Sequence, residues 1–183
     1  MKFNLDTSWT LFLDRDGVIN EKLENDYVKN WDEFVFKCGA LEAIAGLREI
    51  FGRIFILSNQ RGVGLGKMTE AELNDILDKM LTSIEETSGK IDQIYHCRDT
   101  DDSSPYRKPN IGMTLLAKQE YPEIEFSKSV MVGDSISDME FGKKLGMKCV
   151  LINSNFDSDN ELEYLRFNSL LEFKNSLKVG QFS

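Results

Sequence analysis

The sequence has little of several residue types. Among 183 residues there are three cysteines, three prolines and one histidine. Cys38, Cys97 and Cys149 are odd in number and widely spaced, so we expect free thiols and no disulfide framework. No apolar run is long enough to span a membrane, and the first residues lack the charged and apolar regions of a signal peptide. We therefore expect a cytoplasmic protein with no membrane partner.

Positive charge is also scarce relative to negative charge. The chain has 22 lysines and arginines against 31 aspartates and glutamates, which gives a formal net charge of -9. Such an acidic chain is not suited to broad, non-specific binding of nucleic acid or of anionic membranes. The length and the ordinary 41% hydrophobic content indicate a single domain over residues 1–183. We expect this domain to be a monomer.

Apolar runs alternate with segments of helical periodicity along the chain. The runs predict buried strands at residues 9–13, 53–57, 91–97, 129–132 and 149–152. The periodic segments predict helices at 40–51, 69–86, 109–121 and 167–177, and one more that follows Asp134 and ends at 145. Thr69 and Glu72 have the spacing of a capping box. A polar loop is expected over 153–160. This alternation predicts an α/β fold, a three-layer sandwich around a mainly parallel Rossmann-like sheet.

Polar clusters follow the predicted strands at the points where they end. The first strand stops on Asp14 and Asp16, and the fourth on Asp134. The second strand leads into Ser58, Asn59, Gln60 and Arg61, and the third is followed by a loop that carries Arg107 and Lys108. Strand ends of a parallel sheet share one edge, where ligands bind. Four such clusters are hard to explain as ordinary turns.

These residue types favour a metal-dependent reaction on phosphate. Paired carboxylates can bind a divalent cation through oxygen, and one of them can attack an electrophile. Hydroxyls, free backbone donors and adjacent cations suit phosphate oxygens. Asp138 lies four residues after Asp134, so both can face one spot if a helix begins between them. The glycines at 62–66 match neither a Walker loop nor a dinucleotide fingerprint, which excludes an ATP or NAD site there.

Taken together, these motifs resemble those of the haloacid dehalogenase superfamily. Asp14-x-Asp16-Gly-Val, Ser58-Asn59, Lys108 and Gly133-Asp134-x-x-x-Asp138 occur in the superfamily's order over residues 10–150. Phe-Leu-Asp-Arg-Asp-Gly-Val-Ile-Asn, Ser-Asn-Gln-Arg-Gly-Val-Gly and Arg-Lys-Pro-x-x-Gly-Met are similar to the branch that contains heptose-1,7-bisphosphate 7-phosphatases and histidinol-phosphate phosphatases. No segment is long enough for an inserted cap domain, so the resemblance implies a capless fold.

The resemblance implies a phosphomonoesterase with a small-molecule phosphate ester as its substrate. Asp14 would form an aspartyl phosphate, and Asp16 would act first as acid and then as base. Mg²⁺ would be held by Asp14, Asp134 and the backbone carbonyl of Asp16. Ser58, Asn59 and Lys108 would bind phosphoryl oxygens, with Asp138 and Ser135 in support. The rest of the substrate would contact residues that lie around this centre, namely Gln60, Arg61, Arg107, Asp26 and Tyr27.

One motif of this branch is missing. Its members usually carry a zinc loop with Cys-x-His early and Cys-x-Cys just before Arg-Lys-Pro. Here Cys97 keeps the first position, but Ser104, Pro105 and Tyr106 occupy the place of the later cysteines. One thiol cannot form a tetrahedral site, so we expect no zinc.

The altered loop leaves the substrate open among several candidates. The expected substrate is a small sugar phosphate such as D-glycero-D-manno-heptose 1,7-bisphosphate, with histidinol phosphate as an alternative. Tyr106-Arg107-Lys108-Pro109-x-x-Gly-Met is also similar to polynucleotide 3'-phosphatases, although the acidic charge counts against nucleic acid. A catalytically silent binder of phosphorylated ligands is the alternative outside the enzymes.

Overall fold

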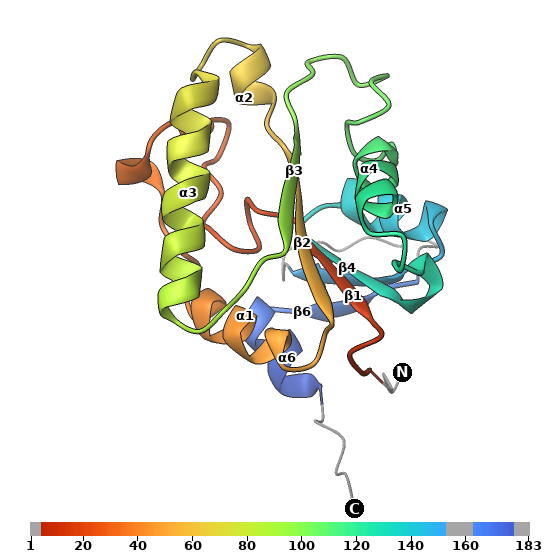
Figure 1. Ribbon diagram of the computed structural model, residues 1–183. Helices are drawn as coiled ribbons and strands as arrows, with labels where there is room; N and C mark the ends of the chain where they lie inside the picture. The colour runs from red at the N-terminus through yellow and green to blue at the C-terminus, as the bar shows by residue number, and fades with distance from the viewer. Residues whose placement is uncertain (1–4, 153–162, 178–183) are drawn as a thin grey trace, which may run out of the picture.

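The computed structural model describes residues 5–152 and 163–177 (Figure 1). The loop expected over 153–160 lies outside this range. Six parallel strands form one sheet in the order β3-β2-β1-β4-β5-β6. The strands are β1 (Thr10–Leu13), β2 (Arg53–Asn59), β3 (Gln93–Cys97), β4 (Ser129–Gly133), β5 (Lys148–Ile152) and β6 (Leu165–Phe167). Within the described residues, no helix has the length and apolar character needed to cross a membrane.

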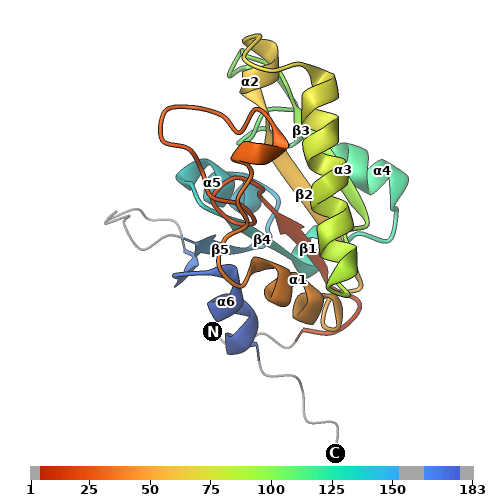
Figure 2. The same cartoon turned by 90° about the vertical axis from the view of Figure 1, so that its left-hand side faces the viewer.

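Helices cover both faces of this sheet, as Figures 1 and 2 show. One face carries α1 (Ala40–Arg48), α3 (Glu70–Glu86) and α6 (Leu170–Ser176), and the other carries α4 (Gly112–Glu120) and α5 (Ile136–Lys144). Alternate residues of β1 point to opposite faces, as the twofold period of a strand requires. Leu11 and Leu13 belong to the core under the first group of helices, while Phe12 belongs to the core under the second. The predicted three-layer α/β architecture is confirmed.

The long connection after β1 is ordered and packs on the body of the protein. It contains a short 3₁₀ helix, Trp31–Glu33. The rings of Trp31 and Phe34 stack with centroids 4.9 Å apart, and Phe36 meets Phe34 edge-on at the same distance. All three contribute to the core that lies against α1 and α3. These aromatic side chains therefore anchor the connection and leave residues 21–28 beside the carboxyl ends of the strands.

Three sequence predictions differ from the structure. The helix expected from Pro109 begins only at Gly112, because the preceding residues form a turn in which the Asn110 N–H donates to the Arg107 carbonyl at 2.8 Å. The last helix begins at Leu170 because residues 165–167 form the edge strand β6, which is too short to show an alternating pattern. A four-residue helix, α2 (Arg61–Gly64), was not expected.

The predicted capping box of α3 is confirmed. The Thr69 side chain accepts a hydrogen bond from the Glu72 N–H at 3.2 Å, and the Glu72 carboxylate accepts one from the Thr69 N–H at 2.7 Å. These bonds satisfy two of the backbone donors that a helix start leaves without partners. Thr69→Ala is expected to cost about 1 kcal/mol in the free energy of unfolding. That loss corresponds to a melting temperature lower by about 2–4 °C, measured by calorimetry.

Thr82→Ala is the matched control for this cap. Thr82 lies within the same helix and is exposed, and its hydroxyl donates to the Asp78 carbonyl four residues earlier. Since alanine is the better helix former, the control is expected to leave the stability within 0.5 kcal/mol or raise it slightly, an order-of-magnitude figure. Equal losses in both variants would contradict a specific role of the cap.

Candidate active site

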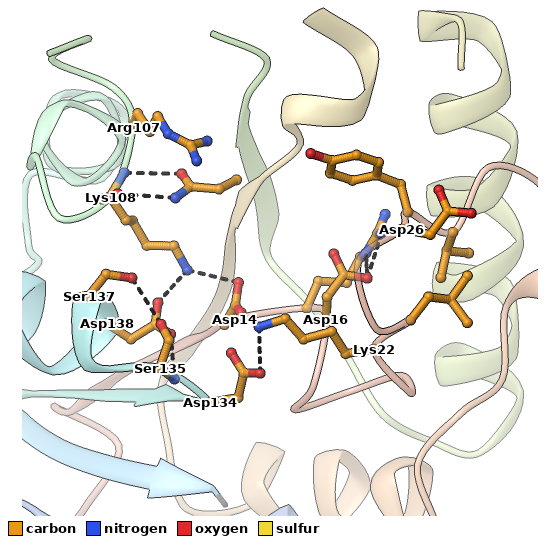
Figure 3. A pocket seen from close by; sticks show the side chains of 15 residues that line it. Asp14, Asp16, Lys22, Asp26, Arg107, Lys108, Asp134, Ser135, Ser137 and Asp138 are labelled. Atoms are coloured by element: carbon orange, nitrogen blue, oxygen red, sulfur yellow. Dashed lines mark hydrogen bonds and ion pairs between the residues drawn. The ribbon is translucent and has the colours of Figure 1, made fainter. Parts of the chain in front are cut away.

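The register of the central strands brings the predicted polar clusters to one edge. Leu13 pairs with Ile56 of β2 and with Val132 of β4, and the Asp14 N–H donates to the Val132 carbonyl at 2.9 Å. Asp14 and Asp134 therefore follow adjacent strands at nearly the same height. They open into a cavity of about 250 Å³, whose lining is shown in Figure 3.

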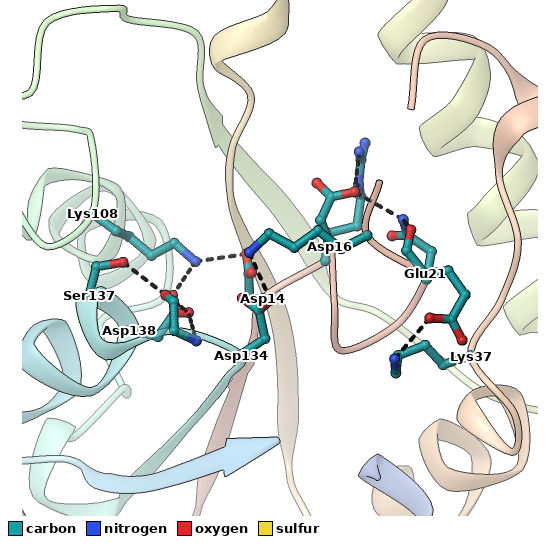
Figure 4. Close-up of polar contacts among 12 residues, drawn as sticks. Asp14, Asp16, Glu21, Lys37, Lys108, Asp134, Ser137 and Asp138 are labelled. Carbon is teal, nitrogen blue, oxygen red and sulfur yellow. Dashed lines mark hydrogen bonds and ion pairs between the residues drawn. The ribbon is translucent and has the colours of Figure 1, made fainter. Parts of the chain in front are cut away.

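Lys108 links two of the carboxylates that line this cavity (Figure 4). Its Nζ lies 2.8 Å from Asp14 Oδ1 and 2.6 Å from Asp138 Oδ1. The side chains of Lys108 and Asp138 are each 2% exposed. The other oxygen of Asp138 accepts from the Ser135 hydroxyl at 2.5 Å, within the capping box that begins α5. The lysine is therefore held at a fixed position, because its main partner is itself fixed by a helix start.

The charges of this cluster shift the pKa values of its members. Burial raises the pKa of Asp14 to about 7, against the opposing effect of Lys108 and with a further contribution from the carboxylates of Asp138 and Asp134. Burial alone would lower the pKa of Lys108, but Asp138 and Asp14 outweigh it and raise that pKa. Three carboxylates thus share one corner of the cavity, with Lys108 and Lys22 as the cations in contact with them.

Asp16 faces the same cavity but is held by a different set of donors. Arg15 binds its Oδ1 at 2.7 Å and Asn20 binds the same oxygen at 2.9 Å, while Gln60 donates to Oδ2 at 2.9 Å. Burial raises the pKa of Asp16, but the Arg15 guanidinium and these hydrogen bonds outweigh it, so the pKa lies below its ordinary value. Asp16 is therefore an ionised carboxylate in this conformation.

The predicted phosphate- and substrate-binding residues at the end of β2 divide into two groups. Asn59 lines the cavity and fixes the backbone of Lys108, accepting from its N–H at 3.0 Å and donating to its carbonyl at 3.1 Å. Ser58 and Gln60 are each 1% exposed, and the Gln60 amide donates to the Ser58 hydroxyl at 2.6 Å. Gln60 thus joins Ser58 to Asp16 from behind the cavity wall.

The residues expected to contact the rest of the substrate are likewise only partly at the cavity. Asp26, Tyr27 and Arg107 line it. Arg61 does not, and its guanidinium lies 3.8 Å from the Asp102 carboxylate on the neighbouring loop. Arg107 is paired with that carboxylate at 2.8 Å. One acidic residue of the loop before Lys108 therefore holds both arginines.

Two glycines allow the backbone to come this close to the carboxylates. Gly17 has a φ of +91°, and a Cβ there would lie 2.3 Å from an oxygen of Asp134. A Cβ at Gly133 would lie 2.2 Å from the Cβ of Asp138. Any larger residue at either position would displace a site carboxylate. The glycine of Asp-x-Asp-Gly and that of Gly-Asp are therefore required by the packing around the site.

The site offers oxygen ligands suited to a hard divalent cation. Asp14, Asp134 and Asp138 each present a ligand atom, and these atoms lie within 4.8 Å of one another. Carboxylate oxygens are the ligands that Mg²⁺ prefers in proteins. Asp14 and Asp134 are two of the expected ligands and stay a prediction, whereas Asp138 bonds to Lys108 and Ser135. The donor set fits Mg²⁺.

The loop that would carry zinc in the resembled branch has other contacts here. The Ser104 hydroxyl donates a short hydrogen bond to the Asp99 carboxylate, and the Cys97 thiol lies 4.0 Å from the same hydroxyl. Burial raises the pKa of the Cys97 thiol, which disfavours the thiolate that a metal needs. The expectation of no zinc stays a prediction.

Several residues that line the cavity were not assigned from the sequence. They are Arg15, Lys22, Leu23, Val28 and Ser137. The sequence carries a signal for two of them. Arg15 is a cation between two aspartates at a strand end, and Ser137 is a hydroxyl between Asp134 and Asp138. Lys22 carries no such signal, because its position depends on how the connection after β1 folds over the sheet.

Comparisons with known proteins agree with this geometry. A family model described as HAD-hydrolase-like matches residues 105–172. The D-glycero-alpha-D-manno-heptose-1,7-bisphosphate 7-phosphatase of Mycobacterium bovis is 33% identical over 169 residues, which cover 90% of this chain and 89% of that protein. The D-glycero-beta-D-manno-heptose-1,7-bisphosphate 7-phosphatase of Escherichia coli is 31% identical over 185 residues, covering 93% and 94%.

A solved structure extends the similarity to the fold. The D,D-heptose 1,7-bisphosphate phosphatase from B. bronchiseptica, complexed with magnesium and phosphate, superposes with a TM-score of 0.84 at 28% identity, covering 92% of this chain and 97% of that one. The chain belongs to the haloacid dehalogenase superfamily of hydrolases. Within it, the chain is a phosphatase similar to the heptose-bisphosphate branch, which confirms the resemblance of the motifs.

Removal of one carboxylate from the cluster is expected to stabilise the protein when no divalent cation is available. Because the pKa of Asp14 is raised in the folded state, the folded protein binds a proton there more tightly than the unfolded chain does. The stability of the wild type in chelator should therefore fall as the pH rises from about 4 to about 7. Asp14→Asn should remove this slope and raise the melting temperature at pH 8 by about 2–4 °C.

Asp26→Asn is the matched control, measured by calorimetry in chelator at pH 5 and pH 8. Asp26 also lines the cavity, but it is half exposed and pairs with Lys29 at 2.6 Å, away from the carboxylate cluster. A hydrogen bond from Lys29 lowers its pKa, so it does not titrate between these pH values. Parallel slopes for the wild type and Asp14→Asn would contradict the raised pKa.

Removal of the shared cation should have the opposite effect. Lys108→Met leaves Asp14 and Asp138 buried without their common partner, which should cost about 3–5 kcal/mol in the free energy of unfolding by urea titration. Adding Asp138→Asn should recover part of that loss, because one of the unpaired charges is then removed. Lys144→Met, on an exposed lysine that bonds to the Pro109 carbonyl, is the control. Strictly additive losses in the double variant would refute a shared cluster.

Proposed function

We propose that the protein is a magnesium-dependent phosphomonoesterase that uses Asp14 as its nucleophile and acts on a small sugar bisphosphate. The observation that carries this proposal is the contact of Lys108 with both Asp14 and Asp138 in the lining of the cavity. The lysine holds Asp14 Oδ1, and in the proposed reaction the other oxygen, Oδ2, attacks the phosphoryl group. In the first step a bond forms from this oxygen to phosphorus, and the ester oxygen departs.

Lys108 and Asn59 stabilise the charge that develops on the phosphoryl oxygens. The ammonium group is fixed by Asp138, and the Lys108 backbone is fixed by two hydrogen bonds to Asn59. Fixed donors of this kind need no reorganisation as the transition state forms. Bound Mg²⁺, held by Asp14, Asp134 and the Asp16 carbonyl, would offset the repulsion between the Asp14 carboxylate and a phosphate dianion.

Asp16 performs both proton transfers. Its carboxyl gives a proton to the departing oxygen, and the resulting carboxylate then takes one from the water that attacks phosphorus and frees Asp14. The three donors around Asp16 favour the ionised form that the second step needs. For the first step the side chain turns from these donors toward the phosphate, where nearby negative oxygens raise its pKa.

The proposed substrate follows from the size and charge of the cavity and from the relatives. A cavity of about 250 Å³ admits one phosphorylated sugar, and Arg107 lines the cavity on the side away from Asp14. A second phosphate on the substrate would be attracted to that guanidinium. The similar proteins from M. bovis and E. coli are named heptose-1,7-bisphosphate 7-phosphatases. We therefore propose D-glycero-D-manno-heptose 1,7-bisphosphate, with hydrolysis at the 7-position.

A substrate panel tests this proposal. Phosphate release should be orders of magnitude faster from heptose 1,7-bisphosphate than from histidinol phosphate or a 3'-phosphorylated oligonucleotide, and chelator should abolish it. Asp14→Asn should lower kcat at least about 10³-fold, because no nucleophile remains. Preference for histidinol phosphate or the oligonucleotide would overturn the sugar assignment. Hydrolysis of none of them, with beryllofluoride binding retained, would favour the silent binder.

A further inference from the structure

Lys22 contacts the carboxylate cluster from the connection after β1. Its Nζ lies 2.8 Å from Asp134 Oδ2, a contact between residues 112 positions apart (Figure 3). The Asp134 side chain is 9% exposed, whereas that of Lys22 is 54% exposed. Lys22 also lies between two hollows, since it lines the cavity described above and an adjoining groove of about 610 Å³. The ammonium group of a half-exposed side chain thus contacts a buried carboxylate.

The two lysines of the site are held very differently. Lys108 is 2% exposed and bonds to two buried carboxylates. Lys22 has a single carboxylate partner among the described residues, and much of its side chain already lies in solvent. Exchange of a buried and doubly bonded cation is costly, whereas a partly exposed ion pair contributes little. Lys22 is therefore the cation of the cluster that can leave.

A divalent cation and Lys22 need the same carboxylate. Asp134 is one of the three residues whose ligand atoms lie within 4.8 Å of one another. A lysine bonded to Asp134 Oδ2 occupies one of these oxygens and places a positive charge beside the others. Two cations at this distance repel each other, and the half-exposed lysine can move away at lower cost.

The released ammonium group remains within reach of the cavity. Its backbone is fixed by the connection that packs against the core, and the hydrogen bond of the Glu21 N–H to the Val35 carbonyl holds the preceding residue at 2.8 Å. The anionic group that enters this cavity during the proposed reaction is the phosphoryl group, and lysine is a good point-charge ligand for phosphate.

We propose that Lys22 exchanges partners during the catalytic cycle. It pairs with Asp134 when the site holds neither divalent cation nor phosphate, and with the phosphoryl group when a divalent cation holds Asp134. This inference rests on the proposed phosphatase function and adds a substrate-binding residue to it. Lys22 thereby makes cation binding and phosphate binding support each other, because the first frees the ligand for the second.

Two titrations of the full chain by calorimetry test the exchange. Lys22→Met should bind Mg²⁺ about fivefold more tightly in the absence of phosphate, since the competing ammonium group is gone. The same variant should bind inorganic phosphate about fivefold more weakly at saturating Mg²⁺, since a ligand is lost. Opposite shifts in the two affinities are not expected from a residue that only supports the fold.

Lys37→Met is the matched control for the change in charge. Lys37 lines the adjoining groove and pairs with Glu21 at 3.0 Å, away from the three carboxylates (Figure 4). Its loss should leave both affinities within about twofold of the wild type. Equal Mg²⁺ tightening in both variants would show a general charge effect and overturn the exchange, as would unchanged phosphate affinity in Lys22→Met.

The wild-type measurements separate this inference from the proposed function. Suppose that the wild type binds Mg²⁺ and hydrolyses the sugar bisphosphate, and that Lys22→Met has the same two affinities. This result would support the function and refute the exchange. A wild type that binds neither Mg²⁺ nor phosphate refutes both. Lys22→Arg keeps the charge and should retain phosphate affinity within about twofold, which excludes loss of folding as the cause.

Discussion

The buried contact of Lys108 with Asp14 and Asp138 is the constraint on which the rest of the site depends. Removing charged groups from water is expensive, and this arrangement is tolerated because the lysine is shared and Asp138 is further bonded to the start of α5. The same contact fixes one oxygen of Asp14, the proposed nucleophile, and holds a cation beside it. In the proposed reaction, stability and reactivity would rest on the same atoms.

The carboxylates of the site come together because parallel strands β1 and β4 end at the same height. Neighbouring strands β1 and β4 place Asp14 and Asp134 side by side, and glycines at 17 and 133 let the backbone pass without a side chain in the way. Burial is the main cause that raises the pKa of Asp14, and the neighbouring carboxylates of Asp138 and Asp134 raise it further. The repulsion between these carboxylates is thus concentrated where the proposed divalent cation would bind.

The connection after β1 serves the core and the site together. Its aromatic rings pack under α1 and α3, and this anchoring presents Lys22, Asp26 and Tyr27 to the cavity. Residues of this connection line both the cavity and the adjoining groove. The exchange proposed for Lys22 would give this connection a role in the reaction, because the partner of Lys22 would depend on whether a cation is bound to Asp134.

The sequence alone determined the α/β architecture and pointed to Asp14, Asp134 and Lys108, which the structure brings to one cavity. Strand periodicity and strand-end polar residues are local signals, and parallel strands necessarily bring their ends to one edge. The sequence could not place β6, which is three residues long, nor show that Gln60 lies behind the cavity wall. It gave no sign of Lys22, since a contact across 112 residues is made only when the connection folds over the sheet. Tertiary packing decided these features, because side-chain direction and long-range proximity are not encoded in any short stretch of chain.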